Sequence, residues 1–186
     1  MGAARVAAIL AASPGHLDAL AAAALAGPDG GWIGAGFVRN AVWDSLSGRM
    51  PDLGALDDID LVHHDAARPD RARDLAWQGA LNAARPRLPW SVTNQARMAG
   101  RNGHAPYRDL GAALAHWPET ATAVAARLAA GRIEVLAPHG TADLFGLMVR
   151  PTPAHAGDAS TVRARLAAKG WAEGWPGLRV AIAEAG

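Results

Sequence analysis

The segment from residue 32 to residue 48 constrains the fold more than any other part of the chain. Its first residues, Trp32-Ile33-Gly34-Ala35, are a short apolar run typical of a strand, and Gly36 ends that run. Apolar residues then recur at helical spacing until Gly48, namely Phe37, Val38, Ala41, Val42 and Leu46. The segment therefore predicts a strand, a tight turn of small residues and a helix.

This turn is suited to binding phosphate. Gly34, Ala35 and Gly36 are small, and a helix that begins at such a turn presents free backbone N–H groups and the positive end of its dipole. Arg39 lies one helical turn further along and can reach the same phosphates. A dinucleotide-binding turn would require Gly-x-Gly-x-x-Gly, and Arg39 occupies the position of the third glycine, which argues against dinucleotide binding.

A pair of aspartates follows a loop that runs from Arg49 to Leu56. The segment from Asp58 to His64 alternates like a strand, so Asp58 and Asp60 would share one face while Ile59 points into the core. Two adjacent carboxylates repel each other unless a divalent cation lies between them, and carboxylate pairs of this kind hold Mg²⁺ in phosphoryl transfer. The alternative is a solvated strand end or an aspartate cap, because Asp-x-Asp alone is a weak signal.

The segment from Pro118 to Gly140 is ambiguous. The alanines of residues 120–130 favour a helix. A hairpin that turns at Ala130-Gly131 is also consistent with the sequence, and we prefer it. In the hairpin, apolar residues of one strand would face those of the other: Val124, Ala126 and Leu128 against Ile133 and Val135.

Helix and strand patterns alternate along the rest of the chain. We expect helices from Ser13-Pro14 to Gly27, over Asp70 to Ala84 with Leu75, Trp77 and Leu81 as anchors, and near Thr161 to Trp171, and strands at Trp90 to Met98 and Leu178 to Ala183. This alternation predicts an α/β or α+β sheet domain. A chain of 186 residues can form one such domain without disulfides, and it contains no cysteine.

Composition excludes several functions. The formal net charge of +1 gives no broad electrostatic footprint of the kind that binds duplex nucleic acid non-specifically, and it leaves a local basic patch open. The alanine-rich start carries Arg5, His16 and Asp18 and is interrupted at Ser13-Pro14-Gly15, which argues against a membrane span and an export signal. We therefore expect a cytoplasmic protein.

Two sets of motifs resemble known proteins. Three segments are similar, in order, to the Gly-Gly-x-Val-Arg-Asp, Leu-x-Gly-Arg and Asp-x-Asp signatures of tRNA nucleotidyltransferases and their polymerase-beta relatives: Gly36-Phe37-Val38-Arg39-Asn40, Leu46-Ser47-Gly48-Arg49 and Asp58-Ile59-Asp60-Leu61. Over nearly the whole chain, further motifs resemble an uncharacterised bacterial nucleotidyltransferase-like family: Val42-Trp43-Asp44-x-Leu46-Ser47-Gly48-Arg49, Asn94-Gln95-Ala96-Arg97, Trp117-Pro118-x-Thr120-Ala121-Thr122-Ala123-Val124, Ala137-Pro138-x-Gly140-x-x-Asp143-Leu144-Phe145 and Arg150-Pro151.

The sequence also departs from these families. Ala35 stands where the transferases often have the first glycine of the pair, and alanine is expected to exclude a positive φ there. Relatives resemble Glu-Val-x-Asn-Gln-Ala-Arg where this chain has Ser91-Val92-Thr93-Asn94-Gln95-Ala96-Arg97, so Ser91 stands at the family's third carboxylate. Ala99 replaces a histidine common in the family. Serine neither holds a metal nor accepts a proton well near neutral pH.

Other residues support less specific interpretations. If the strand from Trp90 is regular, Arg97 shares the face of Ser91 and either approaches substrate phosphates or forms a surface salt bridge. His63-His64-Asp65 resembles a zinc cluster, but successive strand residues face opposite sides, so at most His64 shares the face of Asp58 and Asp60, which disfavours zinc. The tryptophans are expected in the core, and Asp143 at a helix start. The sequence leaves two roles open for Arg150, catalytic support and an ion pair.

The resemblance implies a polymerase-beta-like nucleotidyltransferase domain with a mixed sheet flanked by helices. We expect a single domain over residues 1–186, with a core at about 30–100 and a C-terminal elaboration at about 118–186. The expected function is Mg²⁺-dependent nucleotidyl transfer from a nucleoside triphosphate to an RNA, protein or small-molecule acceptor. Asp58 and Asp60 would hold the metal, and Gly34, Ala35, Gly36, Arg39 and Arg97 would bind the nucleotide. Ser91 motivates the main alternative, a catalytically inactive nucleotide- or metal-binding module, and an interaction protein built on the same fold is a third.

Overall fold

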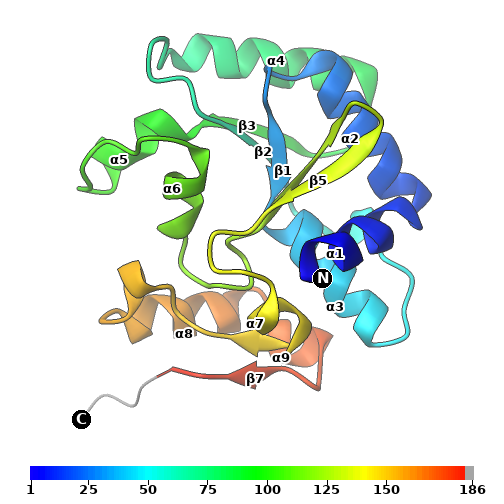
Figure 1. Ribbon diagram of the computed structural model, residues 1–186, viewed down its shortest axis with the longest axis vertical. Coiled ribbons are helices and arrows are strands. Elements are labelled where there is room, and N and C mark those ends of the chain that lie inside the picture. The colour runs from blue at the N-terminus through cyan, green and yellow to red at the C-terminus, as the bar shows by residue number, and fades with distance from the viewer. Residues whose placement is uncertain (183–186) are drawn as a thin grey trace.

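The strand that carries Asp60 lies inside a mixed five-stranded sheet in the computed structural model, which describes residues 1–182 (Figure 1). The strand order is β3-β2-β1-β4-β5. β2 and β3 are parallel and are connected through α4, whereas the other neighbours are antiparallel. The strands are β1 (Trp32–Gly34), β2 (Ile59–His63), β3 (Trp90–Asn94), β4 (Ala125–Ala129) and β5 (Arg132–Leu136).

The hairpin prediction for residues 118–140 is confirmed. β4 pairs with β5, with Ala126 opposite Val135 and Leu128 opposite Ile133. Ala130 and Gly131 form the turn with φ values of 47° and 72°. Two successive positive φ angles match the twist of the flanking strands, so the turn determines the register.

Helix ends follow local capping signals. The helix α2 (Pro14–Ala26) begins with Pro14 after Ser13 and ends at Gly27. The helix α4 (Arg71–Ala84) is capped by the Asp70 carboxylate, which accepts from Ala72 N at 2.8 Å. The longer helices are α1 (Gly2–Ala11), α2 (Pro14–Ala26), α3 (Gly36–Leu46), α4 (Arg71–Ala84) and α8 (Ala159–Ala168), and the shorter ones are α5 (Met98–Arg101), α6 (Leu110–Ala115), α7 (Ala142–Phe145) and α9 (Trp171–Gly174). Short 3₁₀ turns lie at Leu53–Ala55, Gln95–Arg97 and Pro153–His155.

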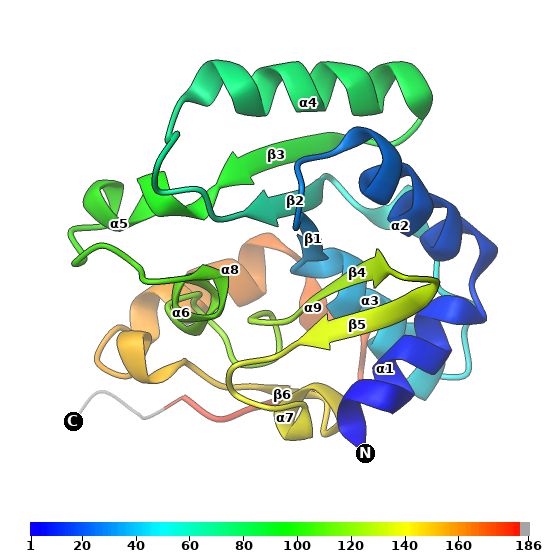
Figure 2. The ribbon, with the colours of Figure 1, turned by 45° about the horizontal axis from the view of Figure 1, so that its top comes forward.

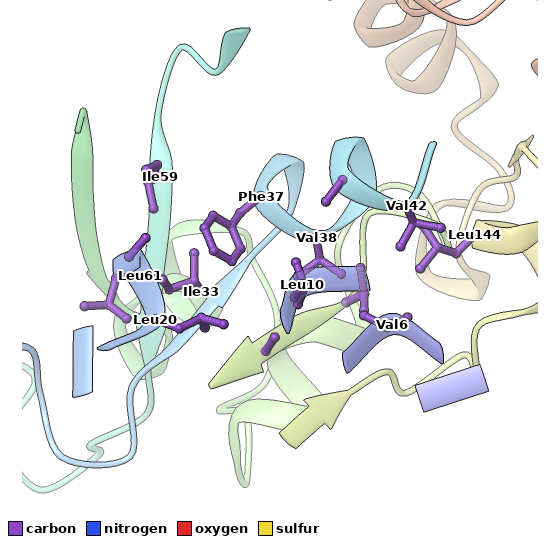
Figure 3. Close-up of a cluster of buried hydrophobic side chains, with 14 of the residues drawn as sticks. Val6, Leu10, Leu20, Ile33, Phe37, Val38, Val42, Ile59, Leu61 and Leu144 are labelled. Atoms are coloured by element: carbon purple, nitrogen blue, oxygen red, sulfur yellow. The ribbon is translucent and has the colours of Figure 1, made fainter. Parts of the chain in front are cut away.

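The largest core lies against the face of the sheet that carries Ile33, Ile59 and Leu61. Figure 3 shows apolar side chains of α1, α2 and α3 gathered on this face and beside it. The sequence interpretation of β2 is confirmed, because Ile59 and Leu61 are fully buried in the core while Asp60 faces the other way. On that opposite face Val62 packs against Leu110 and Leu114 of α6.

The C-terminal part lies beside the sheet rather than within it (Figures 1 and 2). It includes a small parallel pair formed by β6 (Met148–Val149) and β7 (Arg179–Val180), together with α7, α8 and α9. The strand expected from Leu178 to Ala183 is therefore shorter, and Ala183 lies outside the described residues. Trp171 and Trp175 of this part join the main core through Trp43, in edge-to-face contacts at 5.9 and 5.1 Å.

Two sequence expectations were wrong. The strand from Trp90 ends at Asn94 and not at Met98, because the Asn94 side chain accepts from Ala96 N at 3.0 Å and turns the chain into the 3₁₀ segment. Leu75 is 53% exposed, whereas Leu81 is fully buried and Trp77 is partly buried. At about 100° per residue, positions 77 and 81 share a face and position 75 lies on the other side.

None of the helices in residues 1–182 is long and apolar enough to cross a membrane by itself. α1 and α2 together reach the length and composition of a span, but they are bent by 99° at the break between them.

Candidate active site

The turn between β1 and α3 has an unusual backbone. Ala35 adopts φ 52° and ψ −124°, so the expectation that alanine would exclude a positive φ here was wrong. The chain passes from strand to helix without a loop, and Ala35 is held by hydrogen bonds from its N–H to Val124 O (3.1 Å) and from Arg39 N to its own carbonyl (3.0 Å). Such a conformation costs an L-residue about 1–3 kcal/mol.

The glycines on either side of Ala35 have little room for a side chain. A Cβ on Gly34 would lie 2.8 Å from Cη2 of Trp117, and one on Gly36 would lie 3.3 Å from Leu56. Gly34 is therefore required by the close approach of the Trp117 ring. Gly36 is the first residue of α3, where backbone N–H groups have no partner within the helix.

Asp58 and Asp60 both line the cavity in front of this turn. Neither carboxylate has a hydrogen-bond or ion-pair partner among residues 1–182, whereas the buried acids Asp44, Asp74 and Glu119 are all paired. Burial, and then the negative charge of Asp58, raises the pKa of the Asp60 carboxyl to about 6. The two carboxylates thus destabilise each other in their charged forms.

Ser91 is the register partner of Asp60 on the neighbouring parallel strand. Paired residues of adjacent strands point to the same face, so the Ser91 hydroxyl and the Asp60 carboxylate lie on one side of the sheet. The position that the family resemblance assigns to a third carboxylate is therefore beside Asp60, and it carries a hydroxyl.

Arg39 is a buried cation next to the turn. Its side chain is 5% exposed and donates to Thr122 Oγ1 at 3.0 Å and to Asn40 Oδ1 at 2.8 and 3.1 Å. The guanidinium also lies 4.2 Å from the ring centroid of Trp171. It has no carboxylate within ion-pair distance in the described part of the chain, and burial lowers its pKa to about 10. A buried cation without a direct counter-ion suits an anionic ligand.

The cavity itself has a volume of about 650 Å³ and is bounded by the turn, the aspartates and the C-terminal helices. Three further cations line it, and each is paired with an acid: Arg49 with Asp44 at 2.7 Å, Lys169 with Asp57 at 2.9 Å and Arg165 with Glu119 at 2.7 Å. Sequence reasoning missed Arg165 and Lys169. Their spacing of four residues on a predicted helix, which places both on one face, was the signal available.

Arg97 is not brought to these residues. It donates to the carboxylate of Asp74, which also accepts from His63 at 2.8 Å, and it lines neither this cavity nor its neighbour. The expected alignment with Ser91 fails because β3 ends at Asn94. His64 contacts Tyr107 O at 2.8 Å, and the described residues include no group of three His, Asp or Glu side chains that could hold a metal. The zinc alternative gains no support.

The remaining sequence questions concern Asp143, Arg150 and the tryptophans. Asp143 lies in the first turn of α7, as expected, and accepts from Thr120 Oγ1 at 2.7 Å and from Arg150 Nε at 3.0 Å. Arg150 is therefore an ion-pair partner. The tryptophans are mostly core residues, with Trp43, Trp90, Trp171 and Trp175 buried.

Comparison with known proteins gives three matches. Residues 21–180 match a protein-family model described as Nucleotidyltransferase. A solved structure described as revealing a CCA-adding enzyme head domain is 28% identical, with a TM-score of 0.82 and coverage of 96% of this chain and 95% of that one. A tRNA-processing enzyme in an apo form is similar in fold, with a TM-score of 0.50, 16% identity and coverage of 88% and 44%. No curated protein matches the chain.

Proposed function

The chain belongs to the nucleotidyltransferase family whose model matches residues 21–180, and from this we propose that it is a nucleotidyltransferase that uses a nucleoside triphosphate. The triphosphate and Mg²⁺ would bind in the 650 Å³ cavity, and the nucleotidyl group would pass to a hydroxyl acceptor. The observation that carries this proposal is the unpartnered pair of Asp58 and Asp60 beside the turn at Gly34, Ala35 and Gly36. A cation would neutralise the carboxylates, and the turn offers N–H groups to phosphate oxygens.

The donor set at the aspartates fits Mg²⁺. This ion prefers oxygen ligands and is commonly held by one or two protein carboxylates, with water and substrate phosphates completing the octahedron. Asp58 and Asp60 supply two carboxylates and have no competing partner among the described residues. The metal would neutralise charge between the aspartates and the triphosphate and would hold the phosphates in place.

The protein groups around the cavity have distinct tasks in the proposed reaction. Backbone N–H groups at Gly36 and the Arg39 guanidinium would bind phosphate oxygens and stabilise the charge that develops on them. Arg165 and Lys169 would leave their carboxylate partners, Glu119 and Asp57, and bind phosphate oxygens instead. The acceptor oxygen forms a bond to the α-phosphorus, the bond from that phosphorus to the bridging oxygen breaks, and pyrophosphate leaves.

A second candidate, a nucleotide-binding module without turnover, is favoured by Ser91. A hydroxyl beside Asp60 supplies neither a third metal ligand of full charge nor a proton acceptor. This module would still bind Mg²⁺ and triphosphate through the two aspartates.

We further propose that the unit is a single domain that acts in the cytoplasm, where triphosphates and Mg²⁺ are abundant. The 28%-identical structure aligns with 96% of the chain, which supports one unit. RNA, protein and small hydroxyl compounds are all candidate acceptors. RNA is included because the chain resembles tRNA nucleotidyltransferases and is similar to a CCA-adding enzyme head domain.

Thermal-shift measurements with each of the four ribonucleoside triphosphates, with and without Mg²⁺, test this proposal. A ligand that binds only the folded state at about 100 times its Kd stabilises that state by about 2.7 kcal/mol. We expect at least one triphosphate to raise the Tm only when Mg²⁺ is present. The absence of any response to all four triphosphates with Mg²⁺ would contradict both candidates.

A further inference from the structure

A second cavity adjoins the first on the face of the sheet that carries Asp60. Its volume is about 280 Å³, and it shares four wall residues with the first cavity: Ala35, Asp60, Thr122 and Arg165. Its other walls come from β3, the 3₁₀ segment after it, α5 and the region around α6. Figure 2 shows α6 beneath the ends of β2 and β3, opposite α4. The two cavities therefore meet at the proposed metal ligand Asp60.

The second cavity differs chemically from the first. Arg165 is its one cation among the described residues, and that side chain is already paired with Glu119 at 2.7 Å. Tyr107 and Trp117 supply aromatic surface, and Thr93, Gln95 and Asn102 supply neutral polar groups. The side chains of Thr93, which is partly buried, and of Asn102, which is exposed, have no hydrogen-bond partner within residues 1–182. Such a lining does not suit a triphosphate, but it suits an uncharged molecule that has hydroxyl groups and an apolar or planar face.

His116 on the wall of this cavity has a defined tautomer. Its Nδ1 lies 2.8 Å from the carbonyl oxygen of Ala112, which can only accept a hydrogen bond. Nδ1 therefore carries the proton, and Nε2 of the neutral ring is a proton acceptor. Ser91 places a hydroxyl beside Asp60, and a hydroxyl is a poor proton acceptor. Among the described residues, His116 is the histidine that lines a cavity to which Asp60 also contributes.

We propose that the second cavity is the acceptor site, and that it takes a small, uncharged, polyhydroxylated compound such as a sugar or a nucleoside. This inference rests on the proposed function of the first cavity. A hydroxyl of the compound attacks the α-phosphorus across Asp60, its proton passes to Nε2 of His116, and pyrophosphate leaves with the electron pair of the broken P–O bond. The volume of about 280 Å³ lies just below the range of small-molecule pockets, about 300–1,000 Å³, so it has room for one small molecule.

Binding can be measured without turnover. The probes are a panel of common monosaccharides and the four ribonucleosides, each at millimolar concentration, detected by saturation-transfer NMR with the full chain. Thr93→Trp fills the cavity from β3, and Asn102→Ala removes one exposed amide. Asn82→Ala, an exposed asparagine on α4, is the matched control. We expect one or more probes to bind the parent and the control, to lose binding to Thr93→Trp and to bind Asn102→Ala several-fold more weakly.

Turnover separates this inference from the proposed function. Pyrophosphate release from a Mg²⁺-triphosphate should rise when the bound probe is added, and it should fall at least tenfold in His116→Ala while triphosphate affinity is retained.

Failure of every probe to bind the parent would overturn the acceptor site even if triphosphate binds. Equal probe binding by the parent, Thr93→Trp and Asn102→Ala would also overturn it, as would release that depends on tRNA or protein and is unaffected by Thr93→Trp. Probe binding without triphosphate binding would instead contradict the proposed function. Should Thr93→Trp fail to fold, Asn102→Ala provides the same test.

Discussion

Ser91 lies directly beside Asp60, in register on the neighbouring parallel strand. Adjacent strands are about 4.8 Å apart, and paired side chains point to the same face, so a carboxylate at position 91 would share a cation with Asp60. One side chain therefore separates this site from an arrangement of three carboxylates.

Ser91→Glu should make the folded state depend on Mg²⁺. Without metal, a third negative charge beside Asp58 and Asp60 should lower the free energy of unfolding, by on the order of 1–2 kcal/mol. With Mg²⁺ the loss should be recovered, and pyrophosphate release should increase. Urea unfolding with EDTA and with Mg²⁺ measures this. Thr93→Glu, two residues further along β3 and opposite Val62, is the matched control and should gain a smaller Mg²⁺ response.

The combined change of Asp58→Asn and Asp60→Asn should weaken Mg²⁺-dependent triphosphate binding by about tenfold or more, because the carboxylates that would hold the cation lose their charge. Isothermal titration calorimetry with the triphosphate found by thermal shift measures the effect. Asp57→Asn alters an acid that lines the same cavity but is bonded to Lys169 at 2.9 Å, so it should retain binding. If the double variant binds Mg²⁺ and triphosphate like the parent, the metal assignment is wrong.

Asp60→Asn should stabilise the metal-free protein above pH 6. The folded-state pKa of Asp60, about 6, exceeds its ordinary value of 3.8, so the folded state binds more protons between these pH values and ionised Asp60 lowers stability at higher pH. The variant should exceed the parent by on the order of 2–3 kcal/mol at pH 7.5 in EDTA, and the difference should vanish as the pH falls toward 4. Comparing the two proteins cancels the opposite trend from His16, whose pKa is lowered by burial to about 4. A difference that does not change with pH would refute the assignment.

Arg39→Ala should reduce both stability and triphosphate affinity. The buried guanidinium hydrogen-bonds to Asn40 and Thr122 and stacks on Trp171, so its loss should lower the free energy of unfolding by on the order of 2–4 kcal/mol. Affinity should fall about tenfold or more through loss of a charged hydrogen bond. Urea unfolding and calorimetry separate the two effects. A loss of stability with unchanged affinity would make Arg39 purely structural.

Ala35→Gly should stabilise the protein by about 1 kcal/mol, because glycine adopts φ 52° and ψ −124° without strain and this gain exceeds its entropic cost. The control is Ala76→Gly, an exposed position in the interior of α4, where glycine should destabilise by about 1 kcal/mol. Urea unfolding compares both. Equal destabilisation by the two substitutions would show that Ala35 is not strained.

Local patterns were sufficient to predict much of the sheet. The strand, turn and helix at residues 32–46, the strand with Asp60 and the hairpin at Ala130-Gly131 all follow from periodicity and turn residues within a short window. The pairing of Asp60 with Ser91 also agrees with the expectation that their strands are neighbours, because two parallel strands connected by one helix commonly lie side by side.

Other features depended on contacts that no local pattern encodes. The sequence pattern of β3 continues beyond Asn94, yet the Asn94 side chain caps the next turn and ends the strand. Arg97, in that turn, forms an ion pair with Asp74 of α4. The positive φ of Ala35 is set by packing of β1 against β4 and not by the preference of alanine. Arg165 and Lys169 reach the cavity only because the C-terminal helices fold back beside α3. A single sequence gives no signal for that return.

The stacking of Trp171 on Arg39 also sets an order of events during translation. Domains begin to fold while synthesis proceeds at about 5–20 residues per second. A nascent chain that has completed α3 already contains Arg39 and the turn at Gly34, Ala35 and Gly36. It contains neither the Trp171 indole that covers the guanidinium nor the cavity-lining cations Arg165 and Lys169. The ribosome must release almost the whole sequence before the cavity is closed on that side, so a chain stalled in synthesis would display the strands of the sheet without the completed cavity.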